Sequence, residues 1–406
     1  MPSPIHYLPR FIAFCAIVWL GATSVGAQSS LSEFHKILRE KAAFNESDFA
    51  ALEQHQTAVH LLPATDKREV AVCGLVKLRV PVDEFLQSFL ESMTQKSNAA
   101  ILEIGRFSQT PTIADLQQLT IEDRDIDDLK DCVVGDCKIK LSAQMIERLR
   151  QEVDWEAPDY RYQAAQLLKR MLAEYVRDYL ARGDGALIEY HDKTDAVRLA
   201  EEQQQLMAAP GYVNAVMPAR PPLKGTSKPP MLLVEDAIVW SKIKFGLKPV
   251  IAFNHITVYR REQESGPEIL ITSKQIYANH YFDSSLALTA FVTIPGAGPE
   301  AYLVYENRSR TDGLSGMFSK MKRGLVEDKA VASLKSVLES SKASLNARGL
   351  SKTESSSTSE AARSWGRWRI SRVQLFFLIF LITALIALLA LRNYSWKGGL
   401  SGAAPR

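Results

Sequence analysis

The sequence predicts an α+β fold: an antiparallel sheet packed on a long C-terminal amphipathic helix, with a helical middle segment and a single C-terminal transmembrane helix. Three observations predict it. Five segments rich in β-branched and aromatic residues follow one another between residues 236 and 310, separated by glycine, proline and serine. Apolar residues at helical spacing follow them. The uncharged apolar run of residues 373–391 is about long enough to cross a bilayer.

The first residues have the pattern of a secretory signal peptide, predicted over residues 1–27. Arg10 supplies a positive charge, the apolar run "FIAFCAIVWLGA" follows, and small residues at positions 25–27 resemble a cleavage site. An uncleaved anchor is the alternative. The sequence then predicts an exported domain over residues 28–345, a serine-rich stalk over 346–372, the membrane span over 373–391 and a cytoplasmic tail over 392–406. In a bacterium the exported domain would be periplasmic.

Composition agrees with a folded domain. Hydrophobic residues make up 46% of the chain and charged residues 23%, so a sizeable core can be buried. The formal net charge of +3 is nearly balanced, so no nucleic-acid partner is expected. No metal-ligand spacing and no phosphate-binding glycine loop is visible, so we expect no metal and no cofactor.

The elements follow from local signals. Alternating β-branched residues predict a strand over residues 68–80, and Pro81 opens a short helix, since proline suits the first turn. Ser142 is a candidate N-cap and Gly183 a candidate helix end, which predicts a helical insertion over about residues 142–208. The five later strands have short connectors, so we expect antiparallel pairing.

Two of the four cysteines lie close together in "CVVGDC". Because an exported protein sits where disulfides persist, we expect Cys132 and Cys137 to be joined. The segment between them contains Gly135 and Asp136, which permit a turn. Cys73 lies in an apolar strand and is expected to be a free, buried thiol.

The order of elements resembles the helix-grip fold of the START-like lipid-transfer and polyketide-cyclase superfamily. A strand and helix in "VAVCGLVKLRVPVDEFLQSF", a helical middle, an antiparallel meander and a long last helix carry the resemblance, over roughly residues 68–345. It rests on element order and no diagnostic motif, and the helical middle departs from it. The resemblance implies a curved sheet around the C-terminal helix, with an apolar cavity between them that binds a hydrophobic ligand. A packed α+β domain without a cavity is the alternative.

Three sets of residues are candidates for function. The polar set contains His255, His280 and Asp283; two histidines and a carboxylate could hold a metal, although we interpret "HYFD" as the polar mouth of the sheet. The ligand-cavity candidates are Tyr277, Tyr281, Leu286, Leu288, Phe318 and Met321. A basic patch that could contact anionic head groups contains Arg308, Arg310, Lys320, Lys322 and Arg323.

These observations favour a membrane-anchored, exported domain that binds a hydrophobic or amphiphilic small molecule such as a lipid. The alternatives are a hydrolase-like enzyme that uses His255 or His280, and a protein-interaction module of the cell envelope. The sequence does not decide whether the chain is an enzyme, and it identifies no catalytic residue and no protein partner.

Overall fold

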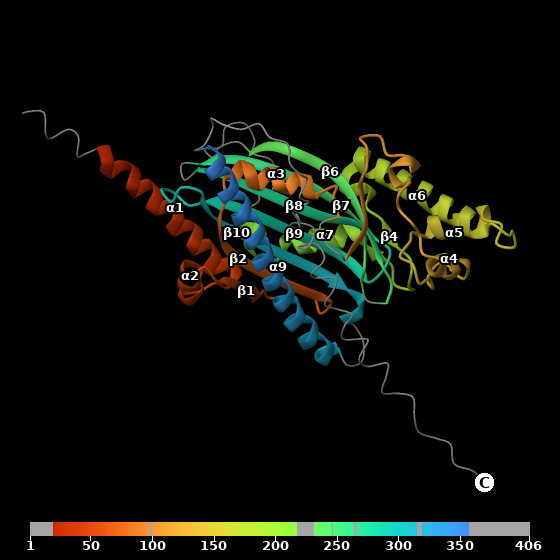
Figure 1. The fold of residues 1–406 in the computed structure, drawn as a ribbon. Coiled ribbons are helices and arrows are strands. Elements are labelled where there is room, and N and C mark those ends of the chain that lie inside the picture. The colour runs from red at the N-terminus through yellow and green to blue at the C-terminus, as the bar shows by residue number, and fades with distance from the viewer. Residues whose placement is uncertain are drawn as a thin grey trace, which may run out of the picture.

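The computed structural model describes residues 19–96, 100–216, 231–245, 247–263, 266–314 and 319–356. Its centre is an eight-stranded antiparallel sheet with the strand order β1–β2–β10–β9–β8–β7–β6–β3 (Figure 1). The strands of this sheet are β1 (Thr57–Leu61), β2 (Glu69–Arg79), β3 (Ile101–Arg106), β6 (Met231–Ile243), β7 (Val250–Gln263), β8 (Gly266–Ala278), β9 (Phe282–Thr293) and β10 (Glu300–Thr311). A separate two-stranded ribbon consists of β4 (Glu189–Tyr190) and β5 (Val197–Arg198).

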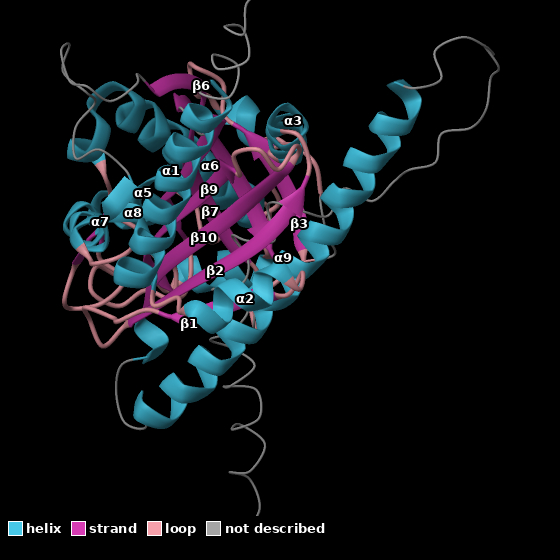
Figure 2. Cartoon of the chain, turned by 90° about the vertical axis from the view of Figure 1, so that its left-hand side faces the viewer, coloured by secondary structure: helices cyan, strands magenta, loops and turns pink. Residues whose placement is uncertain are grey.

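Helices cover both faces of the sheet. They are α1 (Trp19–Ala42), α2 (Glu46–Glu53), α3 (Val82–Ser92), α4 (Asp123–Lys130), α5 (Ala143–Glu152), α6 (Tyr160–Arg182), α7 (Leu199–Ala208), α8 (Tyr212–Val216) and α9 (Ser319–Ser356). Figure 2 shows α3 and α9 on one side of the strands and α1, α5 and α7 on the other. We call the side with α3 and α9 the α9 face and the other side the opposite face.

Each face has its own apolar core. On the α9 face, Phe85 of α3 stacks on Phe291 of β9, and Leu334 and Leu338 of α9 are fully buried against β2. Helix α9 packs closely on β2 at Gly74, because a Cβ atom added to this glycine would lie only 2.4 Å from Leu338 Cδ1. The opposite face has two cores, one under α1 and α2 and one under α4, α5 and α6. The strands therefore bury apolar side chains on both sides.

Local signals explain the helices of the middle segment. Ser142 Oγ accepts a hydrogen bond from Met145 N–H and caps α5. Gly183, at φ 60°, ends α6 in a conformation that favours glycine. The predicted N-cap at Ser142 and the predicted helix end at Gly183 are both confirmed.

The predicted arrangement of a sheet packed on the C-terminal helix is wrong. Eight strands spaced by about 4.8 Å span some 34 Å, whereas one helix is only about 10 Å wide, so it cannot cover such a sheet. Helix α9 contacts β1, β2 and the short 3₁₀ helix Asp312–Leu314. The fold is α+β, but the sheet dominates it.

The predicted transmembrane helix is not found. Among the described residues no helix combines the length and apolar character that a membrane crossing needs, and residues 357–406, with the predicted span, tail and most of the stalk, lie outside them. The signal-peptide prediction is also corrected. Residues 25–27, the expected cleavage site, lie inside α1, which continues to Phe34 and Leu38 in the core. Residues 1–18 lie outside the described residues. Export stays a prediction.

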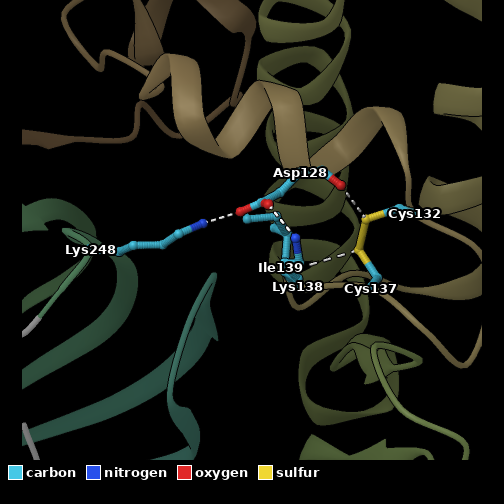
Figure 3. Close-up of a disulfide and its surroundings, with 6 residues drawn as sticks. All are labelled: Asp128, Cys132, Cys137, Lys138, Ile139 and Lys248. Carbon is cyan, nitrogen blue, oxygen red and sulfur yellow. Dashed lines mark hydrogen bonds and ion pairs between the residues drawn. A yellow bond between two sulfur atoms is a disulfide. The ribbon is translucent and has the colours of Figure 1, made fainter. Parts of the chain in front are cut away.

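A disulfide joins Cys132 and Cys137, whose Cα atoms lie 4.5 Å apart (Figure 3). Cys73 is free and buried. Gly135, at φ 88°, makes the turn between the two cysteines. Gly135 N–H donates to His191 O, and Cys137 N–H donates to Asp192 O. The disulfide loop is thereby held against the segment that follows β4.

Candidate functional site

The "HYFD" segment forms the tight connection between β8 and β9. Tyr281 has a φ of 62°, so the chain reverses here instead of continuing as one strand. His280 Nε2 lies 3.1 Å from both carboxylate oxygens of Asp125, whereas Asp283 accepts hydrogen bonds from Lys140 and Arg68, each at 2.9 Å. His280 and Asp283 are buried with separate partners. The polar end of the sheet is therefore buried, and His280 and Asp283 make separate sets of hydrogen bonds there.

The ion pair of Asp125 makes stability depend on pH. Burial alone would raise the pKa of Asp125, but the hydrogen bonds and charges of His280 and Lys248 outweigh burial and hold that pKa below its usual value. A lowered pKa in the folded state stabilises the fold above the unfolded pKa of about 4, and the gain is lost as the pH falls through the folded pKa. We expect the unfolding free energy, measured with urea, to drop below pH 4, and Asp125→Asn to reduce that drop. An unchanged pH dependence in the variant would contradict this assignment.

The two candidate histidines do not meet. Asn279 N–H donates to Ile251 O, and Ile251 lies four residues before His255 on β7. At about 3.3 Å per residue, His255 is therefore some 13 Å along the sheet from the turn that holds His280. Within the described ranges, no group of three histidine, cysteine or acidic side chains could hold a metal ion. A site shared by His255 and His280 is excluded by this separation.

The ligand-cavity candidates do not line one cavity. Tyr277 belongs to the core under α6, Leu288 to the core under α1, and Tyr281 packs on Phe245. Leu286 alternates with Leu288 and so points to the same, opposite face, away from α9. Phe318 lies outside the described residues, as does the side chain of Met321. The prediction assumed that only one face of the sheet is buried, whereas helices cover both faces of the sheet.

The predicted basic patch is not a surface. Arg308 and Arg310 are each 1% exposed and form ion pairs with Glu69. Arg323 donates to backbone oxygens of β2 and its preceding loop and pairs with Glu327. The side chains of Lys320 and Lys322 lie outside the described residues. With both β10 arginines buried, the prediction of a patch for anionic head groups, and with it lipid binding, loses its basis.

One candidate, His255, lies in the wall of a pocket. The pocket has a volume of about 440 Å³ and is lined by Arg106, Phe107, Ser108, Gln109, Leu180, Asp236, Ala237, Ile238 and His255. We call it the His255 pocket. It lies on the opposite face, beside the end of β3, the loop that follows β3, and α6.

The register between β6 and β7 places Asp236 next to His255. His255 of β7 stands opposite Ile238 of β6, so Asp236, two residues away, projects from the same face. The pairing of β6 with β7 is continuous from Glu235 to Ile243, and its one irregularity, between Leu233 and Glu235, lies just before Asp236. The position of Asp236 follows from pairing between strands, which the sequence does not display.

The imidazole of His255 is held at both nitrogens. Nε2 lies 2.5 Å from Asp236 Oδ1, and Nδ1 lies 2.8 Å from the hydroxyl of Tyr179. If the Tyr179 hydroxyl donates to Nδ1, the ring proton is on Nε2 and faces the carboxylate. Burial raises the pKa of Tyr179 even though Lys274 acts to lower it, so the phenol keeps its proton at neutral pH. Tyr179 and Asp236 therefore orient the ring.

Two other polar side chains that line the pocket are the charged Arg106 and the neutral Ser108. Arg106 Nη2 donates to Glu235 Oε1 at 2.8 Å, and its side chain is partly exposed. Ser108 Oγ donates to Thr110 O at 2.9 Å and lies 3.0 Å from Asp115 Oδ2. Since Ser108 is engaged elsewhere, the pocket does not contain a serine–histidine–aspartate triad.

No family model, no curated protein and no solved structure matches this chain. The helix-grip resemblance stays a prediction. The function is therefore argued from the site alone.

Proposed function

We propose that the chain binds a small polar molecule with an anionic group in the His255 pocket, and that the His255–Asp236 pair exchanges a proton with it. One observation carries the proposal: an imidazole oriented by a carboxylate and a phenol stands in the wall of a pocket. A histidine with these two partners is pre-organised for proton transfer, because the ring neither rotates nor changes tautomer freely.

The size and lining of the pocket support a small ligand. A volume of 440 Å³ lies in the range of small-molecule sites, about 300–1,000 Å³. Phe107 and Ile238 supply apolar contact area, and Ser108 and Gln109 supply hydrogen-bonding groups. This combination fits a compact molecule with polar groups better than a long acyl chain.

Arg106 supplies the preference for an anion. A guanidinium has five N–H donors in a planar fork, and within the described chain Glu235 accepts a hydrogen bond from only one nitrogen of Arg106. The other donors suit a carboxylate or phosphate. The same anion would be repelled by Asp236, so we expect it to lie toward Arg106 and to present a proton-accepting or proton-donating group to His255.

The other functions stay predictions. The binding of a hydrophobic ligand has no cavity formed by the candidate residues to support it. For the hydrolase alternative, His255 does line a pocket, but within the described residues no serine is hydrogen-bonded to it; Ser108 instead contacts Thr110 and Asp115. A protein-interaction function and a membrane partner are not favoured by any observation at this site.

The test uses malate and glycerol 3-phosphate as probes, with glycerol as their neutral counterpart. We expect both anions to shift the imidazole resonances of His255 in NMR spectra and glycerol to leave them unchanged. Arg106→Gln should weaken binding about tenfold or more, because a charge-assisted hydrogen bond contributes about 1.5–3 kcal/mol. His255→Gln should retain binding, because Arg106 holds the anion.

The matched control is Arg198→Gln, which removes another partly exposed arginine with acidic partners, Glu189 and Glu201. It lies outside the pocket lining and should leave binding unchanged. If neither anion shifts the His255 resonances, or if Arg198→Gln weakens binding as much as Arg106→Gln does, the proposed site is wrong.

A further inference from the structure

The α9 face of the sheet becomes polar where β6, β7 and β8 lie side by side. Cross-strand pairing places Asn254 opposite Gln275, and Ser273 opposite Ile256, which is part of the apolar core of this face. Ser241 pairs with Ala252 and so shares the face of Asn254. These four polar side chains, Ser241, Asn254, Ser273 and Gln275, form what we call the Asn254 cluster.

The members of the cluster are buried without partners. They are between 1% and 7% exposed. Within the part of the chain that the structure describes, no hydrogen-bond partner is found for Ser241 Oγ, Ser273 Oγ, Gln275 Nε2 or the two amide atoms of Asn254. Buried polar atoms nearly always have a partner, because leaving them unpaired sacrifices their hydration. Five unpaired atoms on three adjacent strands are therefore available to a partner from outside the described residues.

Neighbouring strands show that this face can satisfy its polar side chains. On β9 and β10, Ser285 Oγ lies 2.7 Å from Ser309 Oγ, and Ser309 Oγ donates to Asn307 Oδ1 at 2.9 Å. Asn307 Nδ2 also donates to Ser285 Oγ at 3.4 Å. The buried polar side chains of β9 and β10 on this face thus have partners, whereas five atoms of the Asn254 cluster, gathered on three adjacent strands, have none among the described residues.

The cluster has no charge of its own. Its groups are two hydroxyls and two carboxamides, which both donate and accept hydrogen bonds. Their direct cross-strand neighbours are apolar or belong to the cluster: Val239, Ala252, Ile256 and Ala287. An ion here would lose its hydration without an opposite charge in these rows, whereas an uncharged molecule would replace water by matched hydrogen bonds.

We propose that the Asn254 cluster is an internal binding site for an uncharged small molecule that carries hydroxyl or amide groups. The site is distinct from the His255 pocket. Asn254 and His255 are consecutive on β7, so their side chains point to opposite faces of the sheet. Either site can exist without the other.

The first experiment compares two buried asparagines in the full chain. Asn279 has partners: its Oδ1 accepts from Ile251 N–H, and its Nδ2 donates to Asp125. We expect Asn279→Leu to lower the melting temperature of the ligand-free protein, and Asn254→Leu to leave it unchanged or raise it. A fall in Asn254→Leu equal to that in Asn279→Leu would overturn the proposal, because it would mean that permanently bound water satisfies the Asn254 amide.

The second experiment measures binding by ligand-observed NMR. The probes are glucose, myo-inositol and nicotinamide, with glucuronate and nicotinate as charged counterparts. We expect at least one neutral probe to bind at least about tenfold more tightly than its charged counterpart, and Asn254→Leu or Ser241→Ala to weaken that binding about tenfold, which corresponds to about 1.4 kcal/mol. Arg106→Gln should not affect it, which separates this site from the His255 pocket. Failure of every neutral probe, or binding unchanged in both cluster variants, would overturn the proposal.

Discussion

Replacing Glu69 by alanine is expected to lower the unfolding free energy by about 3–5 kcal/mol, which is the usual cost of removing one partner from a buried ion pair. The Glu69 side chain is fully buried between two arginines of β10. Its carboxylate accepts from Arg308 Nη1 at 2.8 Å and from Arg310 Nη2 at 3.3 Å. Without this carboxylate, the buried guanidinium groups of Arg308 and Arg310 keep only their other acidic partners, Glu306 and Glu202. Urea unfolding followed by circular dichroism measures the loss.

The control for this prediction is Glu46→Ala. Glu46 also pairs with an arginine, Arg39, but it is largely exposed, so solvent screening leaves the pair little net value. We expect little change in the unfolding free energy. Equal losses in the two variants would mean that burial of the β10 arginines does not govern their contribution.

The second large effect is expected at Asp283, on the other side of the turn between β8 and β9. Asp283 is 2% exposed and receives Lys140 Nζ and Arg68 Nη1, both at 2.9 Å. Burial alone would lower the pKa of Lys140, but the charges of Asp283, Asp192 and Asp312 outweigh it and raise that pKa, so the ammonium stays charged. Asp283→Ala should therefore cost about 3–5 kcal/mol, because it leaves a buried cation short of its nearest acid.

A double-mutant cycle separates the ion pair from the packing around it. Lys140→Met removes the buried charge and keeps an unbranched side chain of similar length. In the Asp283→Ala background it should restore part of the lost stability, although alone it destabilises the protein. If the two losses simply add, Lys140 and Asp283 are not coupled and the assignment is wrong. The raised pKa of Lys140 adds stability below about pH 10 that is lost only at higher pH, so the cycle is best measured at neutral pH.

Much of the secondary structure could be predicted because its signals are local. The five strands from β6 to β10 are joined to one another by short connectors and are rich in β-branched residues, and α5 begins after Ser142 and α6 ends before Gly183. The face that each strand residue occupies could not be predicted in the same way. In β9, alternation alone does not tell whether Leu286 and Leu288 or Ser285 and Ala287 face α9, since both faces are covered by helices.

The site illustrates the same limit. His255 was a candidate from the sequence, but its partners Asp236 and Tyr179 lie 19 and 76 residues away along the chain. Arg308 and Arg310 looked like part of a surface patch because their acidic partner, Glu69, is about 240 residues away. A sequence alone does not tell which charged side chains are buried together, because the pairing of distant strands decides it.

The order of the strands also has a consequence during synthesis on the ribosome. Strand β2 lies between β1 and β10, and about 220 residues separate the end of β2 from the start of β10. At about 5–20 residues per second, roughly 10–45 s pass before β10 exists to pair with it. Pairing at such a sequence separation also carries a high loop-closure cost, which slows folding. During this time one edge of β2, whose residues 70–76 form an uncharged apolar run, has no native partner, so β2 is where a nascent chain would most need protection from aggregation.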